Sequence, residues 1–397
     1  MELALNITDI VFFTALGLST AYLFVFALFS MKKRDYAFPP TDKRHRITVF
    51  IPAYKEDAVI RETTASAMAQ DYPADAFEVA VIADGLRADT VETLVKAGAK
   101  VIEVSFENSS KAASLKYAVK HMGDDHKAEI AVILDADNTV GRDFLSRINE
   151  AYHSGAMAMQ AHRRPKNLDT DTAVLDAVSE EINNSIFRRG HVALGISAAL
   201  SGSGMAFDYG WFRENAESLS TAGEDKELEV LLLKQGVFIE YLDHVDVMDE
   251  KTRRDSAFYN QRRRWLSAQV HSLASGIKDL PGAVLSGNID YCDKLLQWMM
   301  PPRIILLGLV PAFGLLMLLT DPRASVKWWA LLLALLLAMA MAIPDYLVDK
   351  RFKRAMHKIP VMFVLMAANI FRIGSNKNKF IHTAHGDATQ HGRKAGT

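Results

Sequence analysis

The chain has 397 residues, of which 46 are Lys or Arg and 47 are Asp or Glu, so its formal net charge is −1. This balance offers no basic excess for nucleic-acid binding, and the single cysteine, Cys292, excludes an internal disulfide framework and a cysteine-based zinc site. Half of the residues are hydrophobic although 23% are charged, which indicates that the apolar residues are concentrated in particular segments. The length allows one large domain with accessory segments.

The first such segment is the uncharged stretch at residues 10–31. It is long enough to cross a bilayer as a helix, which takes about 20 apolar residues. Lys32, Lys33 and Arg34 follow it directly, whereas a cleaved secretory signal carries its positive charges before the apolar run. We therefore expect an uncleaved transmembrane anchor, with everything after Arg34 in the cytosol.

Residues 46–275 contain no spanning stretch and alternate between short β-branched or apolar runs and helical runs. Strands are predicted at 47–51, 78–83, 100–104 and 130–134, and helices at 59–68, 90–97 and 111–121. This order predicts an α/β domain with a twisted, mostly parallel sheet that is covered on both faces. Such sheets bind their ligands at the carboxyl ends of the strands.

Acidic residues follow three of the predicted strands: Glu56 the first, Asp84 the second, and Asp135 with Asp137 the fourth. Each alone is more simply the start of a loop. Together at one edge they would form a rim of carboxylates without a basic partner nearby in the sequence, and such carboxylates repel one another unless a cation joins them. An Asp-x-Asp pair suits Mg²⁺ or Mn²⁺ held jointly by the protein and a diphosphate.

Two further motifs allow more than one interpretation. Asp225 precedes a helical run at 226–233, so the residues alone favour an N-cap carboxylate there. In the run Gln261-Arg-Arg-Arg-Trp265, adjacent arginines on a helix face different ways. One of them can therefore face a diphosphate while Arg262 or Arg263 meets anionic lipid or protein. Trp265 suits either the membrane interface or the apolar face of a sugar.

Uncharged stretches at 304–320 and 328–344 are joined by a short, nearly neutral link, and a strongly basic segment at 349–358 follows them. The positive charge favours the cytosol, so we expect a transmembrane hairpin at 303–348, preceded by an interfacial helix at 284–302. The apolar run at 359–371 is short for a span. An interfacial or re-entrant helix at 359–373 is therefore favoured over a third crossing.

Together these motifs resemble glycosyltransferase family 2, with its GT-A fold, in the membrane-bound branch that includes cellulose, chitin and hyaluronan synthases. The resemblance covers residues 46–269 and is carried by Val49-Phe-Ile-Pro-Ala-Tyr-Lys-Glu56, Gln70-Asp-Tyr-Pro73, Asp84-Gly85, Lys111, Asp135-Ala-Asp137, Ser201-Gly-Ser-Gly204, Gly223-Glu-Asp225 and Gln261-Arg-Arg-Arg-Trp265. Two positions depart from the family. Gly223 stands where Thr is common, and Ala83 stands where a second aspartate often precedes the equivalent of Asp84.

The resemblance implies a metal-dependent, inverting hexosyltransferase that uses a nucleotide sugar, expected to be a UDP-sugar. Asp225 would be the general base that deprotonates the acceptor hydroxyl, and Mg²⁺ or Mn²⁺ on Asp135 and Asp137 would stabilise the leaving diphosphate. The implied contacts to the donor nucleotide are Pro52, Tyr54, Glu56, Asp84, Lys111 and Asp135. The implied contacts to the diphosphate and the acceptor are Gly202, Ser203, Glu224, Gln261, Arg264 and Trp265.

The segment Phe380-Ile-His-Thr-Ala-His-Gly386 resembles the gating loop of cellulose synthases, which closes over the nucleotide. Phe380 and Thr383 match that loop, whereas His382 and His385 replace Val and Lys. The resemblance implies a cytosolic tail at 376–397. A metal site on the tail histidines is an alternative, although solvated histidines are the simpler interpretation.

The implied setting is the bacterial inner membrane, with a multi-pass enzyme whose catalytic domain is cytosolic and which acts in exopolysaccharide or capsule synthesis. Its acceptor would be a polysaccharide or a lipid-linked glycan. The Gln-x-x-Arg-Trp motif favours processive elongation, but so few spans would need a homo-oligomer or an export partner to form a channel. Addition of one sugar to a lipid-linked acceptor is the alternative. A non-catalytic nucleotide-binding subunit of an export complex is disfavoured because every expected acidic position is filled.

Overall fold

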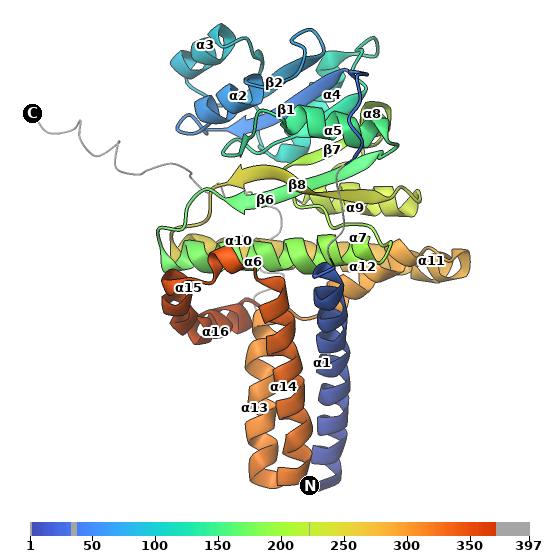
Figure 1. Cartoon of the computed structure of the whole chain (residues 1–397), viewed down its shortest axis with the longest axis vertical. Coiled ribbons are helices and arrows are strands. Elements are labelled where there is room, and N and C mark those ends of the chain that lie inside the picture. Colours follow the sequence, from blue (N-terminus) through green and yellow to red (C-terminus); the bar gives the residue numbers. More distant parts are fainter. Residues whose placement is uncertain (1, 33–37, 222, 371–397) are drawn as a thin grey trace, which may run out of the picture. The chain divides into compact units, whose positions relative to one another are not determined.

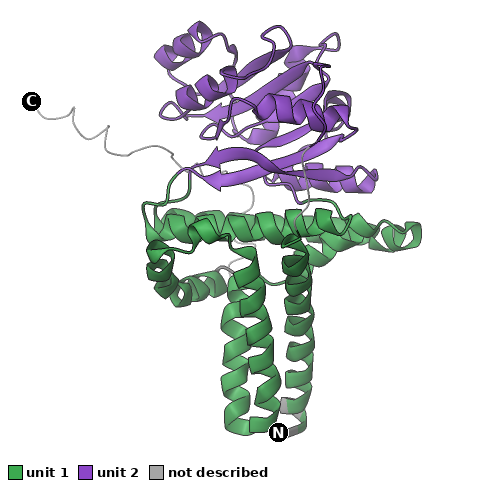
Figure 2. Cartoon of the chain, viewed as in Figure 1, with its two compact units in different colours: residues 1–35, 167–198, 251–376 green, residues 36–166, 199–250, 377–397 purple. Residues whose placement is uncertain are grey.

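The computed structural model describes residues 2–32, 38–221 and 223–370. The chain forms two compact units (Figure 2). The described residues of the sheet unit are 38–166, 199–221 and 223–250, and those of the helical unit are 2–32, 167–198 and 251–370. The predicted continuous block at 46–275 is therefore divided between two units. Residues 167–198 and everything after 250 in that block belong with the apolar helices.

The described residues of the sheet unit form one sheet of eight strands in the order β3-β2-β1-β4-β7-β6-β8-β5. Parallel pairing joins β1 (Ile47–Tyr54) to β2 (Phe77–Asp84) and to β4 (Ile130–Ile133), and β2 to β3 (Lys100–Val104). The order then reverses, because β7 (Met205–Asp208) is antiparallel to both β4 and β6 (Ala158–Pro165). Strand β8 (Ile239–Asp249) is parallel to β6 and antiparallel to the short β5 (Thr139–Val140).

The predicted α/β fold with a mostly parallel sheet is confirmed, as are its first four strands and three helices. Their ends shift by a few residues at most, and the helices are α2 (Ile60–Met68), α3 (Ala88–Lys96) and α4 (Lys111–Met122). Strands β1, β2 and β4 are buried along almost their whole length, as their continuous apolar runs require. The remaining helices of this unit are α5 (Phe144–His153), α8 (Tyr209–Ala216) and α9 (Glu224–Lys234).

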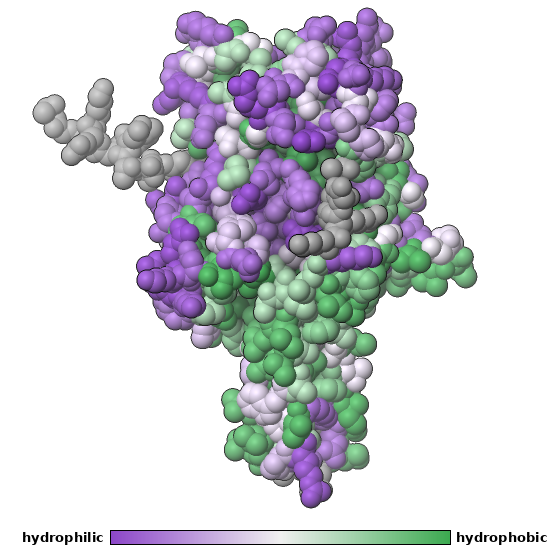
Figure 3. Space-filling model, viewed as in Figure 1, coloured by the Kyte–Doolittle hydropathy of each residue, from purple (hydrophilic) through white to green (hydrophobic). Residues whose placement is uncertain are grey.

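In the part of the helical unit that the structure describes, three helices are long and apolar enough to cross a membrane, at Asn6–Ser30, Arg303–Thr320 and Pro322–Ala342. They belong to α1 (Glu2–Ser30), α13 (Arg303–Thr320) and α14 (Pro322–Ala342), which lie side by side in Figure 1 under a mainly hydrophobic surface (Figure 3). Helix α14 begins earlier than the predicted stretch because the Asp321 carboxylate caps it through the backbone N–H groups of Arg323 and Ala324.

Helix α14 consequently contains Lys327, which forms an ion pair with Asp9 of α1. The second oxygen of the Asp9 carboxylate accepts a hydrogen bond from Trp328 Nε1 at 2.8 Å. Both partners of this buried carboxylate come from the hairpin, so the contacts fix the position of α1 against α14.

Further helices of the same unit lie across the ends of these three (Figure 1). They are α6 (Asp171–Asn183), the π-helix η1 (Asn184–Gly190), α7 (His191–Ala193), α10 (Asp255–Gly276), α11 (Leu280–Ser286) and α12 (Ile289–Met299), followed later in the chain by α15 (Lys350–Ala355) and α16 (Ile359–Ile370). Single turns of 3₁₀ helix occur at Ile277–Asp279, Asp345–Leu347 and Met356–Lys358. A Cβ atom at Gly190 would lie 2.2 Å from the Phe26 carbonyl oxygen, so η1 approaches α1 closely enough to require glycine there.

Candidate active site

A buried cluster of charged side chains lies at the start of α4. Ser110 caps this helix by accepting a hydrogen bond from Ala113 N at 3.1 Å, which places Lys111 in the first turn. The Lys111 ammonium contacts Asp135 Oδ1 at 2.6 Å, Glu224 Oε1 at 3.3 Å and the Gly202 carbonyl oxygen. The carboxylates lack a basic partner nearby in the sequence, but α4 brings the distant Lys111 to Asp135.

The loop before β7 passes close to this cluster. Gly202 has φ +84°, and a Cβ atom there would lie 3.9 Å from both Lys111 Nζ and Glu224 Oε1 and 4.0 Å from Asp225 Oδ2. The Asp225 carboxylate therefore converges on the same point as Lys111 and Glu224. A side chain at 202 would occupy the space that these groups surround, and its positive φ would also be strained.

Asp225 is not the N-cap of α9. That helix begins at Glu224, with Gly223 in the cap position, and Asp225 lies in its first turn. Its Oδ1 atom accepts a hydrogen bond from Lys226 N at 2.9 Å. The first turn directs both acidic side chains toward Gly202.

Burial and neighbouring charges divide the carboxyl groups into two kinds. Burial raises the pKa of Glu224 to about 7 although Lys111 opposes the rise, and the charges of Asp225 and Asp135 add to it. Burial also disfavours the charge of Asp135, but Lys111 and Arg163 outweigh it and hold the pKa of Asp135 below its usual value. Asp135 therefore stays ionised at neutral pH while Glu224 is poised to exchange a proton.

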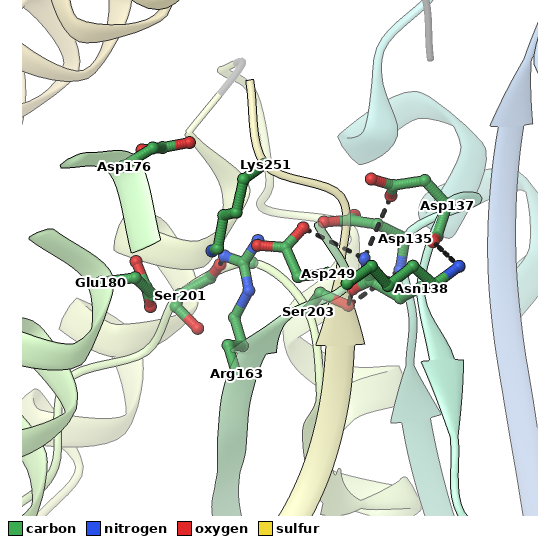
Figure 4. Close-up of polar contacts among 12 residues, drawn as sticks. Asp135, Asp137, Asn138, Arg163, Asp176, Glu180, Ser201, Ser203, Asp249 and Lys251 are labelled. Atoms are coloured by element: carbon green, nitrogen blue, oxygen red, sulfur yellow. Dashed lines mark hydrogen bonds and ion pairs between the residues drawn. The ribbon is translucent and has the colours of Figure 1, made fainter. Parts of the chain in front are cut away.

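The loop after β4 is held by a second network, which includes three residues that the sequence analysis missed: Asn138, Arg163 and Asp249 (Figure 4). The Asn138 amide nitrogen donates to Asp137 Oδ1 at 3.1 Å and to Asp249 Oδ1 at 3.3 Å. Asp249 Oδ2 in turn accepts a hydrogen bond of 2.6 Å from Arg163 Nη2. The buried Asn138 side chain thus links one motif aspartate to the end of β8.

Ser203 connects the same amide to the other motif aspartate. Its hydroxyl donates to Asn138 Oδ1 and accepts a hydrogen bond from Asp135 N at 2.9 Å. Sheet topology explains this meeting. Strand β7 is antiparallel to β4, and Ile133 pairs with Met205, so the chain entering β7 lies beside the chain leaving β4. The parallel pairing of β6 with β8, in which Pro165 lies opposite Asp249, brings Asp249 to the same edge.

The Asp-x-Asp pair can hold part of a metal coordination shell. No group of three or more His, Cys, Asp or Glu side chains in the described ranges is arranged to bind a metal ion by itself. Only one oxygen of Asp135 is bound by Lys111, and 34% of this side chain is exposed. Mg²⁺ is commonly held by one or two carboxylates together with substrate phosphates and water, so this donor set fits Mg²⁺ or Mn²⁺ bound jointly with a diphosphate.

An unsatisfied carboxylate marks the end of β2. Asp84 is 4% exposed, and its Oδ2 atom is buried without a hydrogen-bond partner among the described residues. Such an orphaned acceptor is unfavourable unless a ligand donates to it. Pro52, Tyr54 and Glu56 lie at the neighbouring end of β1, where Tyr54 pairs in register with Asp84. The predicted donor-nucleotide residues from these two strands are therefore brought together.

The remaining predicted residues lie elsewhere in the chain. Gln261, Arg264 and Trp265 are on α10 of the helical unit, where the Arg262 guanidinium lies 4.5 Å from the centroid of the Trp265 ring and pairs with Asp176 at 2.6 Å. Arg262 is thus an arginine of this run that contacts protein. Phe380, Thr383 and the tail histidines lie outside the described residues, so the gating-loop interpretation stays a prediction.

Comparison with known proteins identifies the family. A family model described as "Glycosyltransferase like family 2" matches residues 45–268. The cellulose synthase 1 catalytic subunit [UDP-forming] of Komagataeibacter xylinus is 33% identical over 105 residues, which are 26% of this chain and 14% of that protein. A probable glucomannan 4-beta-mannosyltransferase of Arabidopsis thaliana is 25% identical over 254 residues, 59% of this chain and 47% of that protein. The chain thus matches less than half of the length of either relative.

A solved structure shares the fold over most of the chain. The mannosyltransferase PcManGT from Pyrobaculum calidifontis, determined in complex with GDP-Man and Mn²⁺, aligns with a TM-score of 0.53 at 20% identity. The alignment covers 86% of this chain and 98% of that one. It therefore extends beyond the sheet unit.

Proposed function

Because this chain belongs to glycosyltransferase family 2, we propose that it transfers a sugar from a nucleotide sugar to an acceptor hydroxyl with inversion at the anomeric carbon. The observation that carries this proposal is the convergence of Asp225 and Glu224 with Lys111 and Asp135 around Gly202. A carboxylate base thereby lies beside the groups that suit a diphosphate, as a single displacement requires.

Each group has a separate role in the proposed reaction. Asp225 accepts the proton of the acceptor hydroxyl as that oxygen attacks the anomeric carbon. Asp135 and Asp137 would hold Mg²⁺ or Mn²⁺, which neutralises the charge that develops on the departing diphosphate. The Lys111 ammonium adds a fixed positive charge to the same region, and Asn138 with Ser203 keeps the two aspartates in position.

The orphaned oxygen of Asp84 supports the nucleotide part of the proposal. This oxygen can accept a hydrogen bond from the ring N–H of uracil or from the corresponding N–H of guanine. Similarity to a UDP-forming cellulose synthase favours a UDP-sugar. Tyr54, Glu56 and Pro52 are proposed to complete this nucleotide contact.

We place the reaction at the cytosolic face of a bacterial inner membrane. The three apolar helices support an anchor and a hairpin, and α12 resembles an interfacial helix. It buries Tyr291, Leu295 and Trp298 but exposes Ile289, Leu296 and Met299. The segment at 284–302 stays a proposed interfacial helix, and the segment at 359–373 stays a proposed interfacial or re-entrant helix. The acceptor is proposed to be a polysaccharide or a lipid-linked glycan, which Gln261, Arg264 and Trp265 would contact.

A transfer assay tests this function. Purified protein in lipid nanodiscs is incubated with Mn²⁺ and labelled UDP-glucose, UDP-N-acetylglucosamine or GDP-mannose in the presence of bacterial lipid extract, and the products are sized. The variant D225N is expected to lose transfer by at least about a hundredfold, the range associated with loss of a general base, while binding the nucleotide normally. E217Q, which alters an exposed carboxylate, is the control.

The product size separates the two modes of action. A ladder of products supports processive elongation, whereas addition of one sugar restricts the function to single transfer. Undiminished turnover by D225N would refute the assignment of Asp225 as the base. Absence of transfer with every donor, together with intact nucleotide binding, would favour a non-catalytic subunit.

A further inference from the structure

Three arginines come together in the helical unit where α13 begins. Arg303 is the first residue of α13, which is a candidate membrane span, Arg262 lies on α10, and Arg188 lies on η1. The charge of Arg303 interacts with those of Arg262 and Arg188 as well as with that of Glu180. Asp176 pairs with Arg262 and Glu180 pairs with Arg188, so three arginines and two carboxylates leave an excess of positive charge at the end of α13 that begins with Arg303.

The hydrogen bonds of Arg303 use only part of its guanidinium. Its Nη2 atom donates to the Ser179 carbonyl oxygen at 3.1 Å, to Ser179 Oγ at 3.3 Å and to Asn183 Oδ1 at 2.8 Å. The Nη1 atom is buried and has no hydrogen-bond partner among the residues that the structure describes. Within the described ranges, no carboxylate lies within ion-pair distance of Arg303. Its hydrogen bonds therefore go to neutral groups, and Glu180 acts on its charge only from beyond ion-pair distance.

Arg262 repeats this pattern. Its Nη2 atom pairs with Asp176 Oδ1 at 2.6 Å, but its Nε atom is buried without a partner in the described part of the chain. The side chain is 13% exposed. Two interacting guanidinium groups therefore each retain a buried, unsatisfied N–H, and such groups are costly unless an acceptor reaches them.

The missing acceptor is best matched by a phosphate. An arginine cannot lose its charge by deprotonation in a protein, so an unpaired, partly buried guanidinium calls for an anion. Its planar donor fork suits the oxygens of phosphate. The N-terminal end of the 18-residue helix α13 adds a positive dipole at the same place. Arg303 keeps partial exposure, which leaves a route for the ligand.

We propose that Arg303 and Arg262 bind the phosphate of a membrane lipid at the head of α13. If the proposed function holds, this phosphate belongs to the lipid carrier of the acceptor, so this assignment of its role rests on that function. Arg262 lies over the ring of Trp265, which connects the phosphate site to the run that is proposed to contact the acceptor. The lipid chain would follow the apolar surface of α13.

Lipid binding can be measured without any nucleotide sugar. The full-length protein in a neutral detergent is titrated with dioleoyl phosphatidic acid, with dioleoylglycerol, which lacks the phosphate, or with inorganic phosphate, and bound species are counted by native mass spectrometry. We expect phosphatidic acid to bind and dioleoylglycerol not to bind. R303Q should weaken phosphatidic acid binding by about tenfold to a hundredfold, the usual effect of losing a charge-assisted hydrogen bond.

Two further variants keep the test decisive. R323Q removes an exposed arginine from the first turn of α14, which follows the end of α13 opposite to Arg303, and should leave lipid binding unchanged. R303K keeps the charge but loses the fork, and it replaces R303Q if that variant does not fold; about tenfold weaker binding is expected. Thermal melts without lipid verify that each variant is folded.

Three results would overturn the proposal. The first is equal binding of phosphatidic acid and dioleoylglycerol, and the second is an unchanged affinity for phosphatidic acid in folded R303Q and R303K. The third is displacement of the lipid by inorganic phosphate at equal concentration, which would assign the site to free phosphate. Sugar transfer is scored separately. Transfer without lipid-phosphate binding refutes only this inference, whereas lipid binding without transfer refutes only the proposed function.

Discussion

Replacing Glu224 by glutamine should make the stability of the protein less dependent on pH. In the folded chain burial raises the pKa of Glu224 from 4.5 to about 7. Because the folded pKa lies above the unfolded one, the neutral carboxyl group stabilises the fold fully below the unfolded value. This stabilisation is lost as the pH rises through 7. Glutamine cannot ionise, so the variant escapes that loss.

The size of the effect follows from the two pKa values. At about 1.36 kcal/mol per pH unit, the difference between 4.5 and about 7 corresponds to about 3 kcal/mol of unfolding free energy. Most of this is lost between pH 5 and pH 8. For a unit of this size the melting temperature of E224Q relative to wild type should therefore rise by about 5–10 °C across that range.

The measurement is a series of thermal melts of the purified, nucleotide-free protein in detergent from pH 5 to pH 8. E217Q, which removes an exposed carboxylate, serves as the matched variant and should follow wild type at every pH. If the difference between E224Q and wild type stays constant with pH, the raised pKa of Glu224 is refuted. If it shrinks toward high pH, the sign of the linkage is wrong.

Two other contacts give separate predictions. N138A should weaken Mn²⁺ binding in the presence of UDP by about tenfold to a hundredfold, because Asn138 orients Asp137. Electron paramagnetic resonance of free Mn²⁺ measures the affinity, and an unchanged affinity would contradict the prediction. The ion pair between Lys327 and the buried Asp9 predicts a coupling energy of about 1–3 kcal/mol in a double-mutant cycle of D9A and K327A. Thermal melts measure the stability of each variant, and additive effects would show that the two residues act independently.

The parts of the fold that the sequence predicts are those with a local signal. Strands β1, β2 and β4 are continuous apolar runs that end in polar residues, so periodicity and turn residues are sufficient to find them. Strand β7 has four residues, and β6 ends in His162-Arg-Arg-Pro165, a sequence typical of an exposed segment. Its arginines lie in the sheet because β8 and the Ser201 carbonyl oxygen supply their partners.

The division into two units also had no local signal. Residues 167–198 follow β6 directly and form a helix with many buried residues, a pattern equally expected of a helix that covers the sheet. Their assignment to the helical unit depends on residues that are distant in the sequence. Arg262 forms an ion pair with Asp176 of α6. Arg303 donates hydrogen bonds to Ser179 and Asn183 of the same helix. Only the folded chain brings these together.

Some residues of the candidate site can be predicted from the sequence, and others cannot. The rule that parallel strands carry ligand-binding groups at their carboxyl ends selects Asp84 and Asp135, which lie at or just after the ends of β2 and β4. It says nothing about groups that arrive at the same edge at the beginning of an antiparallel strand, as Ser203 does before β7. The role of Asn138 depends on these neighbouring strands. Its amide can bridge Asp137 and Asp249 only when β4, β7, β6 and β8 are in register. A slip of one residue in β7 would therefore disturb both motif aspartates at once.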